Sequence, residues 1–325
     1  MSYLGRAWYS KAARLLKTIQ DWSGLGVEIE FVSQLPIRDS TNPIPPIILP
    51  RMSLEDHAGD VIAKSRRMLK IAEDRVASAA GLSTAELSDY EDLGELKKEL
   101  NWTEVANLLA LDAGRLERMA KGWEPGQPDL GTWREFRQIT TIGPTMDVHA
   151  YLIWDEVTRE AAIFDTGFDP TPIFEIIDQE KLTPTYLFIT HMHGDHVAGL
   201  EPIKNRYPDI TMKAESDTVP RHCRNKRTDF LHLGSLRISN RDTPGHAVDG
   251  VTYIVGNFPD DAPSIAIVGD AIFAGSMGGA PNAGELAKQK VRAQILSLPD
   301  ETLITPGHGP LTTVGEEKEN NPFYP

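Results

Sequence analysis

The feature that most constrains this chain is a short segment, THMHGDH at residues 190–196, which begins at the end of the apolar run YLFIT. Alternate side chains of a strand point to one face, so His191 and His193 can converge, and the turn at the next glycine brings Asp195 and His196 beside them. Imidazoles and a carboxylate gathered this closely repel one another or lose hydration unless a cation neutralises them. Nitrogen and oxygen ligands of this kind satisfy Zn²⁺ or Fe²⁺. The segment therefore predicts a metal site.

Three more candidate ligands stand in glycine-flanked loops farther along the chain: His246 in TPGHAVDG, Asp270 in IAIVGDAIF and His308 in ITPGHGP. Each residue alone is also typical of a simple turn or a helix cap. Loops that leave the strands of an α/β sheet can meet at one edge, even when those strands are distant in sequence. Taken with residues 190–196, the three loops predict one metal centre assembled from four parts of the chain.

A Gly- and Pro-rich segment at residues 122–131 separates two patterns of residues. We therefore predict a helical domain at 1–132 and an α/β catalytic domain at 133–325, in which short β-rich runs alternate with helical stretches. The predicted strands are 136–142, 149–154, 161–165, 186–190, 210–214, 236–239, 251–255 and 264–268, and the predicted helices are 172–179, 197–206 and 283–298.

Within the first part, two pairs of residues predict capping boxes at helix starts, Ser53 with Asp56 and Ser83 with Glu86. The segment NPIPPIILP at 42–50 predicts a stiff connector, because prolines fix φ and remove hydrogen-bond donors.

These motifs resemble the metallo-β-lactamase superfamily, and within it the glyoxalase II (hydroxyacylglutathione hydrolase) branch. HMHGDH matches the HxHxDH signature, and the PGH, GD and PGHGP motifs follow in the family order over about residues 136–325. The resemblance implies an αββα sandwich, here preceded by a helical extension. Glyoxalase II proteins carry a further helical domain after this core that contacts glutathione. This chain stops at Pro325, so we do not carry glutathione recognition over.

The resemblance also assigns the candidate ligands. His191, His193 and His246 would hold one metal, Asp195, His196 and His308 a second, and Asp270 would bridge them. We count Asp195, His196 and Asp270 as catalytic, and Asp165 in AAIFDTG would orient the ligands. The expected cofactor is Zn²⁺, as one or two ions, with Fe²⁺ or mixed Fe, Zn and Mn as the alternative.

The ligand set predicts the chemistry. Two metals ~3.5–4 Å apart lower the pKa of a shared water from 15.7 towards ~7, and the resulting metal-bound hydroxide attacks a carbonyl whose oxyanion the metals stabilise. We therefore expect a metal-dependent hydrolase that cleaves a small carbonyl substrate. An acyl thioester is the substrate class that we expect first, followed by an ester or a lactone. The first alternative is a persulfide dioxygenase, which in this superfamily uses one iron held by the equivalents of His191, His246 and Asp270.

Residues 64–121 resemble, less specifically, the helix-turn-helix of phage-repressor-type regulators. That implies a second alternative, a ligand-sensing DNA-binding regulator. DNA affinity depends on cations that contact phosphates, yet residues 61–123 carry ten Lys and Arg against eleven Asp and Glu. We therefore expect a helical module that packs on the catalytic domain, forms a homodimer contact or covers the mouth of the site.

Composition narrows the partners and the compartment. The whole chain carries a formal charge of −14, which argues against nucleic-acid binding and favours a small-molecule substrate. Its single cysteine cannot form an internal disulfide, and no apolar run approaches the ~20 residues of a membrane span, so we expect a cytoplasmic protein. Residues 1–20 have apolar positions at helical spacing and four basic residues, which predicts an amphipathic helix that packs on the protein, touches a membrane or directs import.

Two further features have open interpretations. His149 lies on a predicted strand that in the family runs near the site, so it either contacts substrate or is a packed or surface histidine. The basic residues Arg221, Arg224, Lys226 and Arg227 either receive an anionic substrate tail or form a solvated loop.

Overall fold

The computed structural model describes residues 53–325 except 97, 145, 216–218 and 226–229, and these residues belong to one compact unit, Arg51–Pro325. The predicted amphipathic helix at 1–20 and the proline-rich connector at 42–50 lie outside the described residues.

The first β-sheet has the strand order β1-β2-β3-β4-β5. Its strands are β1 (Phe136–Ile142), β2 (Asp147–Trp154), β3 (Glu160–Phe164), β4 (Thr183–Phe188) and β5 (Thr211–Lys213). β1, β2 and β3 pair in antiparallel fashion, whereas β3, β4 and β5 are parallel neighbours. Parallel strands need a crossover. Helix α7 (Thr171–Glu180) makes the first, and α8 (Gly194–Val197) with α9 (Leu200–Arg206) makes the second.

The second β-sheet has the order β11-β10-β9-β8-β7-β6. Its strands are β6 (Leu231–Leu233), β7 (Leu236–Asp242), β8 (Val251–Gly256), β9 (Ile265–Gly269), β10 (Leu303–Pro306) and β11 (Thr312–Thr313). Only β9 and β10 are parallel, and α10 (Gly284–Gln294) connects them. Helix α11 (Val314–Asn320) follows the last strand, and short 3-10 helices stand at η1 (Leu130–Thr132), η2 (Arg221–Cys223) and η3 (Pro259–Asp261).

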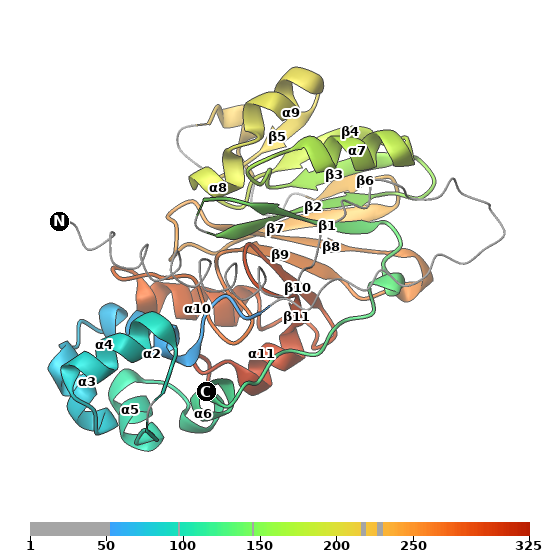
Figure 1. Ribbon diagram of the computed structural model, residues 1–325. Coiled ribbons are helices and arrows are strands. Elements are labelled where there is room, and N and C mark those ends of the chain that lie inside the picture. The colour runs from blue at the N-terminus through green and yellow to red at the C-terminus, as the bar shows by residue number, and fades with distance from the viewer. Residues whose placement is uncertain (1–52, 97, 145, 216–218, 226–229) are drawn as a thin grey trace, which may run out of the picture. The chain divides into compact units, whose positions relative to one another are not determined.

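The two sheets pack face to face around an aromatic core. The Phe188 ring lies 4.9 Å from the Phe164 ring and 4.8 Å from the Tyr253 ring, measured between centroids, and all three side chains are buried. Apolar side chains of α7 and α9 cover the outer face of the first sheet, and those of α10 and α11 cover the second (Figure 1). The expected αββα sandwich is confirmed.

The described part of residues 53–123, which we call the helical module, contains five α-helices: α2 (Ala58–Met68), α3 (Glu73–Ala80), α4 (Thr84–Leu93), α5 (Trp102–Leu109) and α6 (Ala113–Ala120). The capping box at Ser83 and Glu86 is confirmed. The one predicted at Ser53 and Asp56 is wrong, because α2 is capped by His57 with Asp60. The Asp56 carboxylate contacts a distant loop instead.

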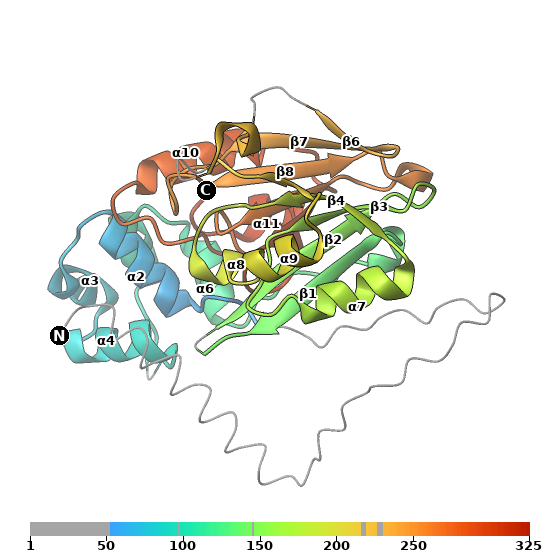
Figure 2. The ribbon, with the colours of Figure 1, turned by 90° about the horizontal axis from the view of Figure 1, so that it is seen from above.

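The helical module packs on the outer side of the second sheet. Val61 and Leu109 of the module share one hydrophobic core with Val291 of α10, Ile304 of β10 and Phe323 near the C-terminus. Both views show the module beside α10 (Figures 1 and 2). The expectation that the module packs on the catalytic region is therefore met by a continuous core, while the domain boundary at 132 stays a prediction.

Several predicted boundaries shift. The strand predicted at 186–190 spans Thr183–Phe188, so the metal-binding motif begins in a loop, and the helix predicted at 197–206 is two helices, α8 and α9. Three strands were not predicted: β6, β10 and β11. Each has two to four residues, too few to show alternation.

Candidate metal centre

The seven candidate ligands come together where loops leave both sheets. His191 and His193 follow β4, and the short helix α8 places Asp195 and His196. The other three stand after β7, β9 and β10. Three sets of nitrogen and oxygen atoms each lie within 4.8 Å of one another: His191, His193 and His246; His191, His196 and Asp270; and Asp195, His196 and His308.

Asp270 lies between the two outer sets. One of its carboxylate oxygens is 3.4 Å from His246 Nε2 and 3.5 Å from His308 Nε2, and the other is 3.3 Å from His196 Nε2. His308 Nε2 is also 3.3 Å from an Asp195 oxygen. The first of these oxygens faces a histidine of each outer set, so the Asp270 carboxylate can contact cations in both.

The hydrogen bonds of the histidines leave a defined nitrogen of each ring for a cation. The Nδ1 atoms of His191, His196, His246 and His308 lie 2.5–3.1 Å from oxygens of Thr190, Asp165, Gly279 and Asp147, respectively. These four rings therefore present Nε2 to the centre. His193 presents Nδ1, which lies 3.0 Å from the Nε2 atoms of both His191 and His246. An outer oxygen partner on the second ring nitrogen is typical of metal-bound histidine.

Two buried atoms at the centre fit a cation. Within the described residues, His196 Nε2 and Asp270 Oδ1 face each other at 3.3 Å yet have no hydrogen-bond partner. An unsatisfied buried polar atom is costly, and a divalent ion with N and O ligands satisfies both of these. The residues present therefore fit one or two divalent ions.

Burial and neighbouring charges shift the pKa values of the side chains at the centre. Burial lowers the pKa of His191 to about 2. For His196 burial opposes the charged form, but Asp165 and Asp270 raise its pKa to about 10. Burial opposes the charge of Asp270 as well, yet His308 and His196 hold its pKa well below the usual range. A divalent ion bound here would compete with protons for these imidazole nitrogens.

Asp165 orients ligands of the turn at residues 191–196, as the resemblance implied. The buried Asp165 carboxylate accepts hydrogen bonds from His196 Nδ1 (2.8 Å), Thr190 N (2.8 Å) and Thr190 Oγ1 (2.7 Å). Since the Thr190 hydroxyl donates to Asp165, it accepts from His191 Nδ1 at 3.1 Å. One carboxylate therefore orients two candidate ligands.

The His308 loop is held by alternate residues of β2. His308 Nδ1 donates to Asp147 O (2.5 Å), and Tyr151 donates to Pro306 O (2.5 Å). Between them, His149 Nε2 donates to Gly309 O at 2.8 Å, and its Nδ1 lies 3.0 Å from the Thr140 hydroxyl. Burial lowers the pKa of His149 to about 4, so the ring is neutral and its Nδ1 accepts. Of its two interpretations, interior packing is the one that the structure supports.

Some supporting residues had no sequence signal. Tyr151, Asp56 and Lys64 contact loops more than 150 positions away. The PGHGP motif, in contrast, is recognisable in the sequence, and the structure explains its first glycine. A Cβ on Gly307 would collide with the Asp270 carboxylate and the His196 ring. Only glycine permits this close approach.

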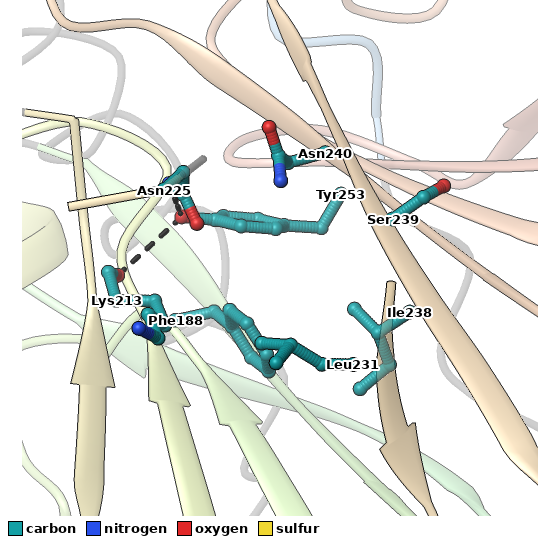
Figure 3. Close-up of a pocket in the computed structure, with 8 residues that line it drawn as sticks. All are labelled: Phe188, Lys213, Asn225, Leu231, Ile238, Ser239, Asn240 and Tyr253. Atoms are coloured by element: carbon teal, nitrogen blue, oxygen red, sulfur yellow. Dashed lines mark hydrogen bonds between the residues drawn. The ribbon is translucent and has the colours of Figure 1, made fainter. Parts of the chain in front are cut away.

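The predicted basic cluster is partly described. Lys226 and Arg227 lie outside the described residues, so its role in binding an anion stays a prediction. Nearby, a cavity of about 20 Å³ opens between the edges of the two sheets (Figure 3). It has room for roughly one water molecule and not for a substrate. Its lining residues are Phe188, Lys213, Asn225, Leu231, Ile238, Ser239, Asn240 and Tyr253.

Comparison with known proteins agrees with this fold and site. Residues 143–308 match the metallo-beta-lactamase superfamily, and the chain belongs to that family. It is 29% identical over 206 residues to "Probable metallo-hydrolase YqgX" of Bacillus subtilis (strain 168), covering 56% of this chain and 94% of the relative. Identity to "Hydroxyacylglutathione hydrolase GloC" of Haemophilus influenzae is 27% over 197 residues, covering 53% of this chain and 90% of that protein.

Among solved structures, ETHE1 from Myxococcus xanthus superposes with a TM-score of 0.51 at 26% identity, covering 58% of this chain and 84% of that one. The relatives named hydroxyacylglutathione hydrolase are glyoxalase II homologues, as the motifs implied. No helix among the described residues has the length and apolarity to cross a bilayer.

Proposed function

We propose that the protein is a metal-dependent hydrolase that cleaves an acyl thioester, with zinc as its metal. The observation that carries the proposal is the placement of Asp270 between the His191, His193, His246 set and the Asp195, His196, His308 set. When bound, divalent ions at these sets supply hydroxide at neutral pH and polarise the substrate carbonyl.

The residues of the chain would bind and orient the reactants. Asp195 and His246 expose 17% and 21% of their side chains, and His193 is exposed, whereas His196 is fully buried. The substrate would therefore approach from the side of these three residues. Asp195 would hold the attacking water with one carboxylate oxygen and accept its proton, while Asp165 keeps His196 fixed.

The thioester assignment is supported by relatives named hydroxyacylglutathione hydrolase, at 24–27% identity. A thioester carbonyl is a small electrophile that needs oxyanion stabilisation more than leaving-group protonation. We further propose that the substrate is a small molecule, that the protein acts in the cytoplasm, and that the helical module contributes a homodimer contact.

A second candidate, a mononuclear iron oxygenase acting on a persulfide, is favoured by one observation. His191, His246 and Asp270 form a compact set of two histidines and one carboxylate, with His246 Nε2 3.4 Å from Asp270 and the His191 and His246 rings 5.2 Å apart. Two histidines and a carboxylate are the ligands of many non-haem iron oxygenases.

One experiment separates the two. Protein with measured metal content is assayed against a panel of acyl thioesters, esters and lactones, and separately for oxygen uptake with a persulfide. We expect zinc-dependent thioester cleavage that Asp270→Ala abolishes, with no oxygen uptake. Iron-dependent oxygen uptake without hydrolysis would overturn the hydrolase proposal.

A further inference from the structure

We propose that Asp56 and Lys64 of the helical module are positioning residues for the metal centre. They hold the loop at residues 271–280, which we call the brace loop, against the side of the centre formed by His246, Asp270 and His308. The inference rests on the metal centre proposed above but not on the choice of substrate.

The two residues grip the brace loop through polar contacts. Lys64 Nζ donates to Met277 O at 2.9 Å, forms an ion pair with Asp56, and lies 5.1 Å above the Phe273 ring. The Asp56 carboxylate, with 5% of its side chain exposed, also accepts from Ser276 Oγ at 2.7 Å. Three residues of one loop are thus held by one carboxylate and one ammonium group from a segment more than 200 positions away.

The brace loop in turn sets three candidate ligands. It begins directly after Asp270, and its Gly279 carbonyl accepts from His246 Nδ1 at 3.1 Å, which leaves His246 Nε2 for the metal. Gly278 packs so closely that a Cβ there would collide with the Asp270 carbonyl and the His246 ring. The Phe273 ring meets the His308 ring edge to face, with centroids 5.8 Å apart.

The helical module also holds the brace loop indirectly, through the C-terminal segment. Asn321 Nδ2 donates to Ser276 O at 2.8 Å, and the Tyr324 hydroxyl lies 3.6 Å from Met277 sulfur. Arg115 of α6 donates to the carbonyls of Asn321 (3.1 Å) and Tyr324 (2.5 Å). The loop is therefore enclosed by the module and by a segment that the module binds, and a shift of Lys64 would move it towards or away from the ligands.

This support lies outside the part of the chain that matches the family. The match begins at residue 143, whereas Asp56 and Lys64 stand about 80 residues earlier. The backbone of Glu55 also packs on Gly309, the residue after His308, since a Cβ there would lie 2.9 Å from Glu55 N. The module thus contacts the loops that follow Asp270 and His308, and this arrangement gives it a role in metal geometry beyond its share of the core.

The test compares Lys64→Met with Ser65→Ala in the full chain. Ser65 is the matched control, because it is buried in the same helix. Its substitution by alanine removes one hydrogen bond, to Leu109 O, that does not involve the brace loop. Zinc affinity is measured by competition with a chromophoric chelator, and the geometry of the site by the visible absorption of the cobalt-loaded protein. We expect Lys64→Met to weaken zinc binding at least about tenfold and to shift the cobalt spectrum. Ser65→Ala should leave both unchanged.

Ser276→Ala provides a milder second variant in case Lys64→Met does not fold. It removes only the hydroxyl that donates to Asp56, and we expect about three- to tenfold weaker zinc binding with an altered cobalt spectrum. If Lys64→Met folds, unchanged zinc affinity and an unchanged cobalt spectrum in that protein would overturn the inference. If Lys64→Met does not fold, the same result in Ser276→Ala would overturn it. An equal loss in Ser65→Ala would also overturn it. Failure of the wild-type protein to bind zinc or cobalt would instead refute the metal centre itself.

Discussion

The two halves of the candidate metal centre are built in different ways. The first half comes from one turn, in which His191, His193, Asp195 and His196 lie within six consecutive positions. The second half, His246, Asp270 and His308, comes from three loops of the other sheet. The two halves approach to 3.3 Å between His196 and Asp270 and between Asp195 and His308. The first half depends on local sequence, whereas the second depends on the whole fold.

The supports of the two halves differ in the same way. Asp165 and Thr190, both from the first sheet, orient the ligands of the turn. The second half is held by β2 and, through the brace loop, by the helical module. Candidate ligands that are close together in the sequence are therefore enough to identify the metal site. The geometry of that site depends on contacts between segments that are distant in the sequence. Substitutions in the two halves and in their supports should therefore differ in their effects on metal binding.

The largest effect should follow loss of the residue that joins the halves. Asp270→Ala removes the carboxylate that faces both ligand sets, so we expect bound metal to fall and kcat/KM to drop by at least about 10²–10³-fold. Metal analysis and a thioester assay measure both. His191→Ala, in the turn, should lower bound metal and kcat/KM in the same way. Full turnover by either variant without bound metal would refute the proposal of a metal-dependent hydrolase.

Loss of the support of the first half should cost less. Asp165→Asn weakens the orientation of His191 and His196, and we expect metal affinity to fall roughly 10–100-fold. The matched control is Asp155→Asn, a buried carboxylate that accepts from Ser235 and Thr158 away from the ligands. The control should lose stability but retain metal affinity. Equal losses in the two variants would show that Asp165 acts through stability alone.

Loss of one support of the second half should be milder still, because β2 holds the His308 loop at several points. His149→Phe removes the donor to Gly309 O, and we expect about three- to tenfold weaker metal binding. It should also lower the free energy of unfolding by about 1–3 kcal/mol, since the Gly309 carbonyl is left without its partner. Chelator competition and urea denaturation measure the two effects. Metal binding equal to that of the wild type would remove β2 from the account of the site.

A further effect, on the pH dependence of stability and not on metal affinity, concerns a buried acid beside the brace loop. Glu317 accepts from Gly275 N at 3.0 Å, and burial raises its pKa from 4.5 to about 7, against the hydrogen bonds from Asn321 and Thr312. Its folded-state pKa exceeds its unfolded value. The folded protein therefore holds this proton more tightly, and the resulting stability is complete below about pH 4.5 and is lost as pH rises through about 7.

Glu317→Gln mimics the protonated acid, so it should remove this dependence. Between pH 5 and 8, the free energy of unfolding of the wild type should fall relative to that of the variant by up to about 3 kcal/mol, measured with urea in the presence of a chelator. Glu319→Gln, on the exposed side of the same helix, is the control. Parallel pH profiles for wild type and Glu317→Gln would contradict the prediction.

The motifs predicted the αββα fold and the gathering of seven side chains, because each ligand stands in a short segment whose residue types are unusual together. Supports were predicted only where they lie in such a segment, as Asp165 does. Asp56 shows why others were not: its spacing from Ser53 mimics a capping box, yet its carboxylate contacts Ser276, 220 positions away. His149 likewise contacts a loop 160 positions away. The β10 strand was missed because four residues ending in proline carry no period.

The central claim, that these seven side chains hold divalent metal, is tested most directly by anomalous X-ray diffraction at the zinc absorption edge from crystals of the zinc-loaded protein. The account predicts one or two peaks at Asp270, between the His191, His193, His246 set and the Asp195, His196, His308 set. Anomalous peaks that lie elsewhere, or none at saturating zinc, would contradict it.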